Sequence, residues 1–286
     1  MDALEPRIAA HPRVREALRS AVRASAPRPA AAIRAAGDFN QSLWAAVLSE
    51  IRWAFTPPRT WLLGVVANLF LAAAWLVVQP LTVHGRHQDW VVLVGTYFSS
   101  FILADVTTTN LLGADHYRVL QAIADGTSMG RILLVKNLTL LVLVGLPTLV
   151  AAVGMTLWFE KVSRLTYTIP NVAVPIVSWI GVGNLVSVLL PVSAEPMVRR
   201  WRQRGDRRRI AGWLSALVLP YALYYVADPM DGVGHRVLWR QAPSLVGRVL
   251  GRESKSFVHL GIALGVWLGC TVLALLWVRR RGLRMG

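Results

Sequence analysis

Six apolar runs, separated by polar and basic links, dominate the pattern of this chain. Each run is close to the roughly 20 residues that an α-helix needs to cross about 30 Å of hydrocarbon. None of them could cross as a lone strand, because only helices and closed barrels satisfy their backbone polar groups in lipid. The pattern therefore predicts six transmembrane helices, at about 60–83, 90–113, 132–157, 170–191, 210–228 and 257–278.

A helical period of apolar residues precedes the first run. It begins near Asp38, is stopped by Pro57 and Pro58, and predicts an interfacial helix that leads into the membrane. Its apolar positions are Trp44, Val47, Leu48, Ile51 and Phe55, and Ser49, Glu50 and Arg52 lie elsewhere on the wheel. Residues 1–37 are rich in Ala, Arg and Pro. We expect them to form a basic cytosolic tail, or a basic amphipathic helix on anionic lipid, ahead of a membrane domain at 38–286.

The distribution of Lys and Arg predicts the orientation. Of the 31 basic residues, 23 lie in the N-terminal segment, the links after runs two and four, and the C-terminal tail, with Lys136 near the start of run three counted with the link before it. The three alternate links hold the other 8. Because cytoplasmic loops carry the excess of Lys and Arg, we expect both termini in the cytoplasm.

The link between the second and third runs contains one short helical pattern. HYRVLQAIA, residues 116–124, predicts a helix that ends at Asp125 and Gly126, and Thr127 or Ser128 would cap the third run. One face of this helix would carry Tyr117, Leu120 and either Ile123 or Ala124. A two-turn helix alone in water is marginal, so its apolar face needs a partner.

The two ends of this link, NLLGADHYR and GRILLVKNL, resemble the first intracellular loop of ABC-2-type permeases, the membrane subunits of ATP-driven exporters. In that family N-x-[FL]-G-x-D closes the second span and R-x-[IL]-L-x-[GV]-K-N opens the third. The matching residues are Asn110, Gly113, Asp115, Arg131, Lys136 and Asn137. Leu112 stands where the family usually has Phe, and a Gly that often follows the Asp is missing. A second element, Gly-Asn-x-x-Ser before a closing Pro, is matched by Gly183, Asn184, Ser187 and Pro191.

The resemblance covers most of residues 40–280 and implies the permease subunit of an exporter in the bacterial cytoplasmic membrane. It implies a dimer with a second permease subunit, identical or homologous, bound to two ATPase subunits that carry ATP and Mg. The short helix would be a cytosolic coupling helix that passes ATPase closure to spans two and three. The residues expected to couple are Asp115, Tyr117, Arg118, Leu120, Ile123 and Asp125. Packing of that helix on the chain's own bundle is the alternative.

Composition supports a membrane protein and excludes other classes. The 286 residues are 55% hydrophobic and 16% charged, whereas soluble domains are nearer a quarter charged. The net charge of +16 could suggest nucleic acid, but the arginines lie between apolar runs. We therefore expect lipid as a partner and no nucleic acid. The single cysteine, Cys270, excludes an intramolecular disulfide and a cysteine-based metal cluster.

No enzyme motif is present in the sequence. None of the three lysines follows a glycine, so a Walker A loop is absent and ATP would bind another chain. The sequence also lacks H-E-x-x-H and a Gly-x-Ser-x-Gly elbow. We expect a non-catalytic transport subunit that holds no cofactor or metal of its own.

Asp105 is the acidic residue inside a predicted span, about two helical turns from its cytosolic end. A charge there costs about 3 kcal/mol on insertion scales. Thr108 and Thr109 follow at i+3 and i+4, and Lys136 is a candidate counter-charge. A structural role for Asp105 is one interpretation. A proton- or substrate-handling role would indicate a secondary transporter, and a membrane scaffold without transport is a third hypothesis.

The last outer link, residues 229–257, is unusually apolar for a surface loop. It resembles the short re-entrant helices that ABC-2 permeases place between their last two spans. An amphipathic helix lying on the outer leaflet is the alternative.

Overall fold

The fold is described from a computed structural model. It covers residues 39–55, 65–66, 69–70, 73–74, 90–104, 109–113, 115–191, 207, 210–212, 214–215, 218–220, 222, 244 and 255–283. Within these parts, every regular element is a helix.

Three helical runs in the described part are long and apolar enough to cross a membrane: Met129–Phe159, Val162–Leu189 and Lys255–Arg281. They confirm long apolar helices at the runs predicted for 132–157, 170–191 and 257–278, and they are consistent with an all-helical membrane protein in the described part. Their elements are α9 (Met129–Leu140), the π-helical turn η1 (Leu141–Gly145), α10 (Leu146–Phe159), the 3-10 turn η2 (Val162–Arg164), α11 (Leu165–Leu189) and α15 (Lys255–Arg281).

The second predicted run is described in part. It contains α6 (Trp90–Ala104), which packs against α10 and α11. The runs predicted at 60–83 and 210–228 lie largely outside the described residues, as do the tail 1–37 and nearly all of the outer link 229–257.

α11 and α15 run in the same direction along the bundle. Asn171 Nδ2 donates to Ser256 Oγ at 3.0 Å, and thirteen residues further along α11, Asn184 Nδ2 donates to Thr271 Oγ1 at 2.9 Å. Gly181 lies between these two contacts, and a Cβ there would be 2.4 Å from Trp267 Cα. The missing side chain therefore lets the two helices approach closely, as small residues do in membrane bundles.

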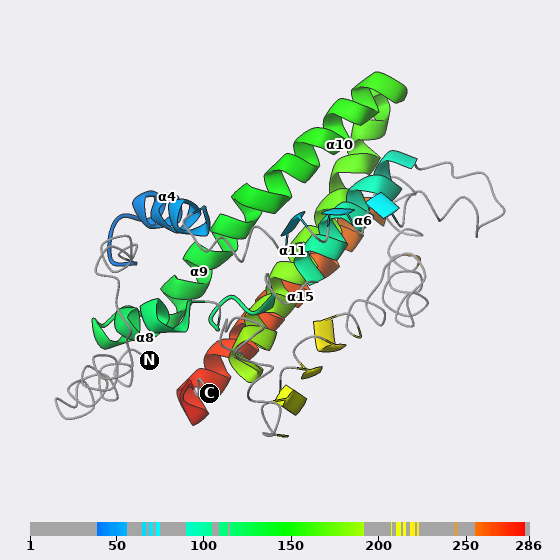
Figure 1. Ribbon diagram of the computed structural model, residues 1–286. Helices are drawn as coiled ribbons and strands as arrows, with labels where there is room; N and C mark the ends of the chain where they lie inside the picture. Colours follow the sequence, from blue (N-terminus) through cyan, green and yellow to red (C-terminus); the bar gives the residue numbers. More distant parts are fainter. Residues whose placement is uncertain are drawn as a thin grey trace.

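α6 also runs parallel to α11, whereas α9 and α10 run antiparallel to it. A Cβ on Gly95 would touch Val172, and the backbone N–H of Leu111 donates to Ser187 Oγ at 2.8 Å. The segment that begins with α6 and helix α11 therefore run in the same direction. By contrast, α10 and α11 form a tight hairpin that Glu160 and η2 close. Figure 1 shows this hairpin at the opposite end of the bundle from α8 and the C-terminal end of α15.

Two short helices lie at the end of the bundle where α9 begins, α4 (Leu43–Ala54) and α8 (His116–Ala124) (Figure 1). The bounds of α8 confirm the sequence prediction residue for residue. Its chain reverses at Gly126, whose φ of 91° suits glycine, and Ser128 then caps α9 by accepting a hydrogen bond from the Arg131 N–H.

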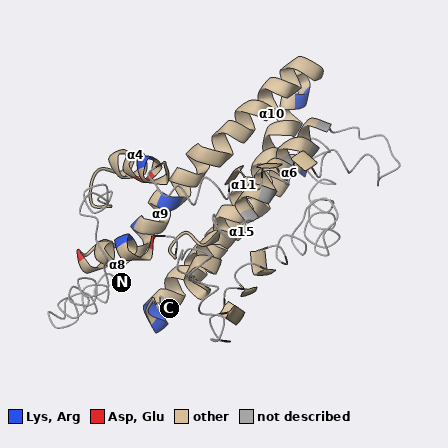
Figure 2. Ribbon diagram, in the orientation of Figure 1, with Lys and Arg blue, Asp and Glu red and all other residues tan. Residues whose placement is uncertain are grey.

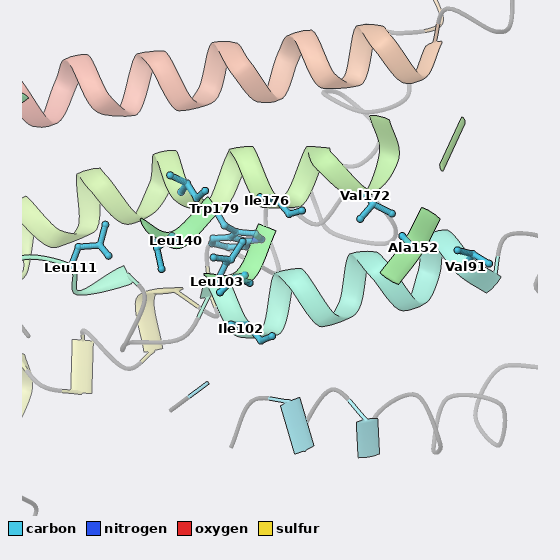
Figure 3. Packing of buried hydrophobic residues seen from close by; sticks show 11 residues of the cluster. Val91, Ile102, Leu103, Leu111, Leu140, Ala152, Val172, Ile176 and Trp179 are labelled. Carbon is cyan, nitrogen blue, oxygen red and sulfur yellow. The ribbon is translucent and has the colours of Figure 1, made fainter. Parts of the chain in front are cut away.

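The buried apolar residues form two main clusters. The membrane core lies between α6, the α10 half of the hairpin and α11, and Figure 3 shows its packing. The end core lies between α4, α8, α9 and the last turns of α11 and α15. Along the long helix Met129–Phe159, Ile132, Leu133 and Val135 belong to the end core, while Leu140 and Val144 belong to the membrane core.

Gly181→Ala should lower the stability of the fold by about 1–3 kcal/mol, because the added methyl group has no room against Trp267. Gly265→Ala is the matched control, since a Cβ at that position of α15 would meet nothing within 4 Å. Thermal unfolding of the purified chain in detergent measures both variants. Equal melting temperatures would contradict this packing.

Candidate functional site

Four charged side chains from three helices meet at the end of the bundle. Glu50 comes from α4, Asp115 and Arg118 from the start of α8, and Lys136 from α9, and we call them the charge cluster. Lys136 Nζ lies 2.5 Å from Glu50 Oε1 and 2.6 Å from Asp115 Oδ2. The Arg118 guanidinium lies 2.8 Å from Glu50 Oε2 and 3.2 Å from Asp115 Oδ2. Each cation therefore bridges both carboxylates.

The charge cluster is removed from water. The side chains of Glu50, Asp115 and Lys136 are at most 4% exposed, and that of Arg118 is 10% exposed. Two cations and two anions balance, which matters because an unpaired charge in such a site is very costly. Figure 2 shows charged residues on α4, α8 and α9 and at the end of α15, with the long helices between the two ends almost free of them.

Aromatic rings cover the two cations of the charge cluster. The Trp53 ring centroid lies 4.9 Å from Arg118 Cζ and 5.2 Å from Lys136 Nζ, and the Phe39 ring lies 5.6 and 6.0 Å from the same atoms. These distances are within the range of cation–π attraction. The rings also exclude water, so the ion pairs act in a medium of low dielectric constant.

The two carboxylates differ in protonation behaviour. Burial raises the pKa of Asp115 above its ordinary 3.8, the charge of Glu50 adds to that rise, and Lys136 and Arg118 only partly offset it. Burial also acts to raise the pKa of Glu50, but attraction by Lys136 and Arg118 outweighs burial and holds that pKa below 4.5. Within the described part of the chain, Asp115 Oδ1 and Arg118 Nε are buried without a hydrogen-bond partner. Asp115 is thus the less well satisfied of the two acids.

The segment before α4 is fastened onto the α8–α9 corner. Arg131 Nε donates to the Phe39 carbonyl at 2.5 Å, its NH2 group donates to the Gln41 carbonyl, and Thr127 Oγ1 lies 2.8 Å from Asn40 Oδ1. Phe39 itself is 3% exposed in the end core. Arg131, one of the motif residues, therefore binds backbone of the N-terminal segment.

The sequence predicts the helical period of α4 but not which of its faces points inward. Glu50, assigned to the polar side of the wheel, is 3% exposed and lies in the charge cluster. Trp44, Leu48 and Phe55 are instead 65, 53 and 50% exposed. This arrangement suits an interfacial helix, because the apolar residues on the outer face can enter lipid while the charged one is neutralised inside.

The expected coupling residues are divided between two faces of α8. Asp115 and Arg118 point into the charge cluster, and Val119 and Ala122 are buried in the end core. Leu120 and Ile123 are half-buried, and Ile123 packs on the end core. Tyr117, Gln121 and Asp125 are exposed, so they form the outward face of α8. The helix thus packs on its own bundle and still presents a second face.

The other motif residues also meet one another. With its amide oriented to satisfy both neighbours, Asn137 donates to Asn184 Oδ1 at 2.7 Å and accepts from Asn184 Nδ2 at 2.9 Å and from Trp267 Nε1 at 3.3 Å. Thr271 also accepts a hydrogen bond from Asn184. We call these four side chains the polar layer. It joins α9, α11 and α15 between the two apolar cores.

Ser187 links the remaining motif segment to α11. Its hydroxyl donates to the Thr109 carbonyl at 2.6 Å and accepts from the Leu111 N–H at 2.8 Å, so it satisfies backbone where the helical run before Asn110 ends. Thr109, Asn110 and Gly113 are all buried. Motif residues far apart in the sequence are therefore structural partners.

Asp105 and Thr108 lie outside the described residues. Lys136, considered as the counter-charge of Asp105, has Glu50 and Asp115 as its ion-pair partners in the described part. Sequence reasoning missed Glu50 and Trp53. Glu50 shares one face of α4 with Ala46, Val47 and Ala54, and this spacing points to a buried carboxylate only once that face is known to be buried.

The site can position helices but offers no visible reaction chemistry. No group of three or more His, Cys, Asp or Glu side chains among the described residues could hold a metal ion. No family model, curated protein or solved structure matches the chain. Its function must therefore be argued from the arrangement of these helices.

Lys136→Met should destabilise the fold by about 3–5 kcal/mol near pH 8, because it leaves two buried carboxylates with one cation. The loss of stability relative to the wild-type chain should be smaller near pH 5. Without Lys136 the folded-state pKa values of both carboxylates rise above their unfolded values, so the folded state gains stability by binding protons as the pH falls.

Lys161→Met, at an exposed position beside η2, is the control and should change little. Denaturant or thermal unfolding at both pH values measures the two variants. A Lys136→Met chain as stable as the control, or a deficit that grows on acidification, would contradict the assignment.

Proposed function

We propose that this chain is the transmembrane permease subunit of an ATP-driven ABC exporter. It works as a dimer with an identical or homologous permease, and two separate ATPase subunits bind the ATP and Mg. The observation that carries the proposal is the attachment of α8. The charge cluster holds this short helix to α4 and α9 while its outward face stays exposed.

The attachment of α8 suits the transmission of force. A two-turn helix that was joined to the bundle only through loops would yield when pushed. Here Val119 and Ala122 pack on the end core, and three ion pairs cross between α8, α4 and α9. A push on Tyr117 or Gln121 would move α9 as well. Nucleotide-driven closure of an ATPase could thus reach the third membrane helix.

The directions of the described helices support six spans. α6, α11 and α15 all run from the hairpin end of the bundle to the α8 end, and α9–α10 runs back. The chain therefore has to return to the hairpin end twice more, between Phe55 and Trp90 and between Leu189 and Lys255. The apolar runs 60–83 and 210–228 fall in these two intervals.

The six spans would place both termini on the α8 side, which the Lys and Arg excess assigns to the cytoplasm of a bacterial cell. The interfacial helix α4 would lie on the same leaflet, with Trp44, Leu48 and Phe55 toward the acyl chains. The outward face of α8 would then point into the cytosol, where an ATPase can bind it.

Single cysteines in a Cys270→Ser background test this topology in whole cells with a membrane-impermeant thiol reagent. Val162→Cys and His87→Cys should be labelled, because both positions lie on the outer side. Gln121→Cys and Arg204→Cys should react only after the cells are permeabilised. Labelling of Gln121→Cys in intact cells would overturn the orientation.

Tyr117→Asp together with Gln121→Asp tests the coupling role. Both side chains are exposed, so the double variant should fold normally. It should retain the ATPase on purification on the order of tenfold less well, as expected for the loss of an interface anchor worth about 1.4 kcal/mol, and lose ATP-dependent export.

Val162→Asp, 69% exposed at the hairpin end, is the matched control for an added surface charge. It should keep both the ATPase and export. If the α8 variant behaves like this control, the coupling role is wrong. Folded wild-type chain purified from its native membrane without any ATPase, but active in proton-driven flux, would favour a secondary transporter instead.

A further inference from the structure

The long helix Met129–Phe159 changes its hydrogen-bonding pattern in the middle. α9 and α10 are joined by a π-helical turn, Leu141–Gly145, in which the N–H of Leu146 reaches back to the carbonyl of Leu141, five residues earlier. Such turns are rare, and within α-helices they are frequently found at functional sites. The run is otherwise continuous from Met129 to Phe159.

Pro147 gives a physical reason for the π turn. A proline inside an α-helix has no N–H to donate, and its ring clashes with the carbonyl four residues before it. One wider turn just before Pro147 relieves both problems, because Pro147 then lies in the first turn of α10, where its N–H is not needed. Thr148 Oγ1 donates to the Val144 carbonyl at 2.8 Å and so supplies one replacement hydrogen bond.

The π turn lies where the two apolar cores meet. α9, on one side, packs chiefly on α4 and joins the end core, and the charge cluster ties it to α4 and α8. α10, on the other side, packs chiefly on α6 and α11 in the membrane core. α9 touches α11 much less extensively than α10 does, and the polar layer forms part of that contact.

We propose that the π turn Leu141–Gly145 is a hinge, about which α4, α8 and α9 move as one body relative to α10 and the membrane core. The charge cluster makes the moving body rigid, because Glu50, Asp115, Arg118 and Lys136 cross all three of its helices. Bending concentrates at the π turn because its backbone is the least regular part of the long helix.

The packing around the π turn limits the bend. A Cβ on Gly145 would lie 3.0 Å from Ile176 Cγ2 of α11 and 2.9 Å from Leu141 Cδ1, so the turn passes close to its neighbour. The exposed side of the same region carries Leu141, Leu146 and Val150, which are 38, 53 and 62% exposed. α11 therefore blocks a bend toward itself, and a swing of α9 toward the open side has to loosen its end-core and polar-layer contacts with α11 and α15. The hinge concerns this chain alone and stands whether or not an ATPase drives it.

Spin-label distance measurements on the full chain in lipid nanodiscs, in a Cys270→Ser background, test the hinge. One pair spans it, from Gln121 on α8 to Val150 on α10, and both positions are exposed. The reference pair, Trp44 on α4 and Gln121 on α8, lies within the moving body. The distance distribution of the spanning pair should be wider than that of the reference pair.

Pro147→Ala should narrow the distribution of the spanning pair to the width of the reference, because the alanine N–H lets the π turn close into α-helix. Pro170→Ala, a proline inside α11, is the matched control and should leave the distribution wide.

Three results would overturn the hinge. The spanning pair could be as narrow as the reference, it could stay wide in Pro147→Ala, or Pro170→Ala could narrow it equally. If Pro147→Ala does not yield folded protein, the widths of the two pairs in the Cys270→Ser chain still decide the question.

Discussion

The described fold depends on the Lys136 ammonium, which lies between Glu50 and Asp115 where water is excluded. Its attraction to them exceeds the cost of desolvation only while all the partners are in place. Three segments from distant parts of the sequence must therefore assemble together, and none of them can leave without stranding a buried charge. The pairing fixes the position of α4 on α9, and it fixes the start of α8 at the same point. The arrangement of α4, α8 and α9 therefore requires this pairing.

Within the long helices, hydrogen bonds and close contacts take over from ion pairs. Lipid and apolar side chains are similar solvents, so helices in a membrane associate through packing and polar contacts. The Asn137–Asn184 amide pair and the approach of Gly181 to Trp267 are contacts of these kinds. They fix which faces of α9, α11 and α15 meet. The parallel course of α11 and α15 is defined by two such contacts, Asn171 with Ser256 and Asn184 with Thr271.

Local features of the sequence could be predicted, and long-range pairings could not. Run length indicates membrane helices because the hydrocarbon thickness sets a minimum, and the bounds of α8 follow from Asp125, Gly126 and Ser128. Asp115 and Lys136 could be selected from the motif, but their partner Glu50 could not. A helical wheel says which residues share a face, but in a membrane protein an apolar face can point to lipid as well as to the core. The orientation of α4 was therefore undetermined until its neighbours were known.

The difference between ion pairs and irregular backbone explains how one helix could hold a rigid end and the proposed hinge. Ion pairs of low exposure resist deformation, because any separation brings unpaired charge into a medium of low dielectric constant. The π turn holds no ion pairs, and its hydrogen bonds already depart from α-helical geometry. Ion pairs therefore hold α9 to its neighbours, whereas irregular backbone would let the same helix bend at Leu141–Gly145. With the proposed hinge at Leu141–Gly145, displacement applied to α8 would pass through the charge cluster to α9 and become a change of angle beside Ile176, inside the membrane core.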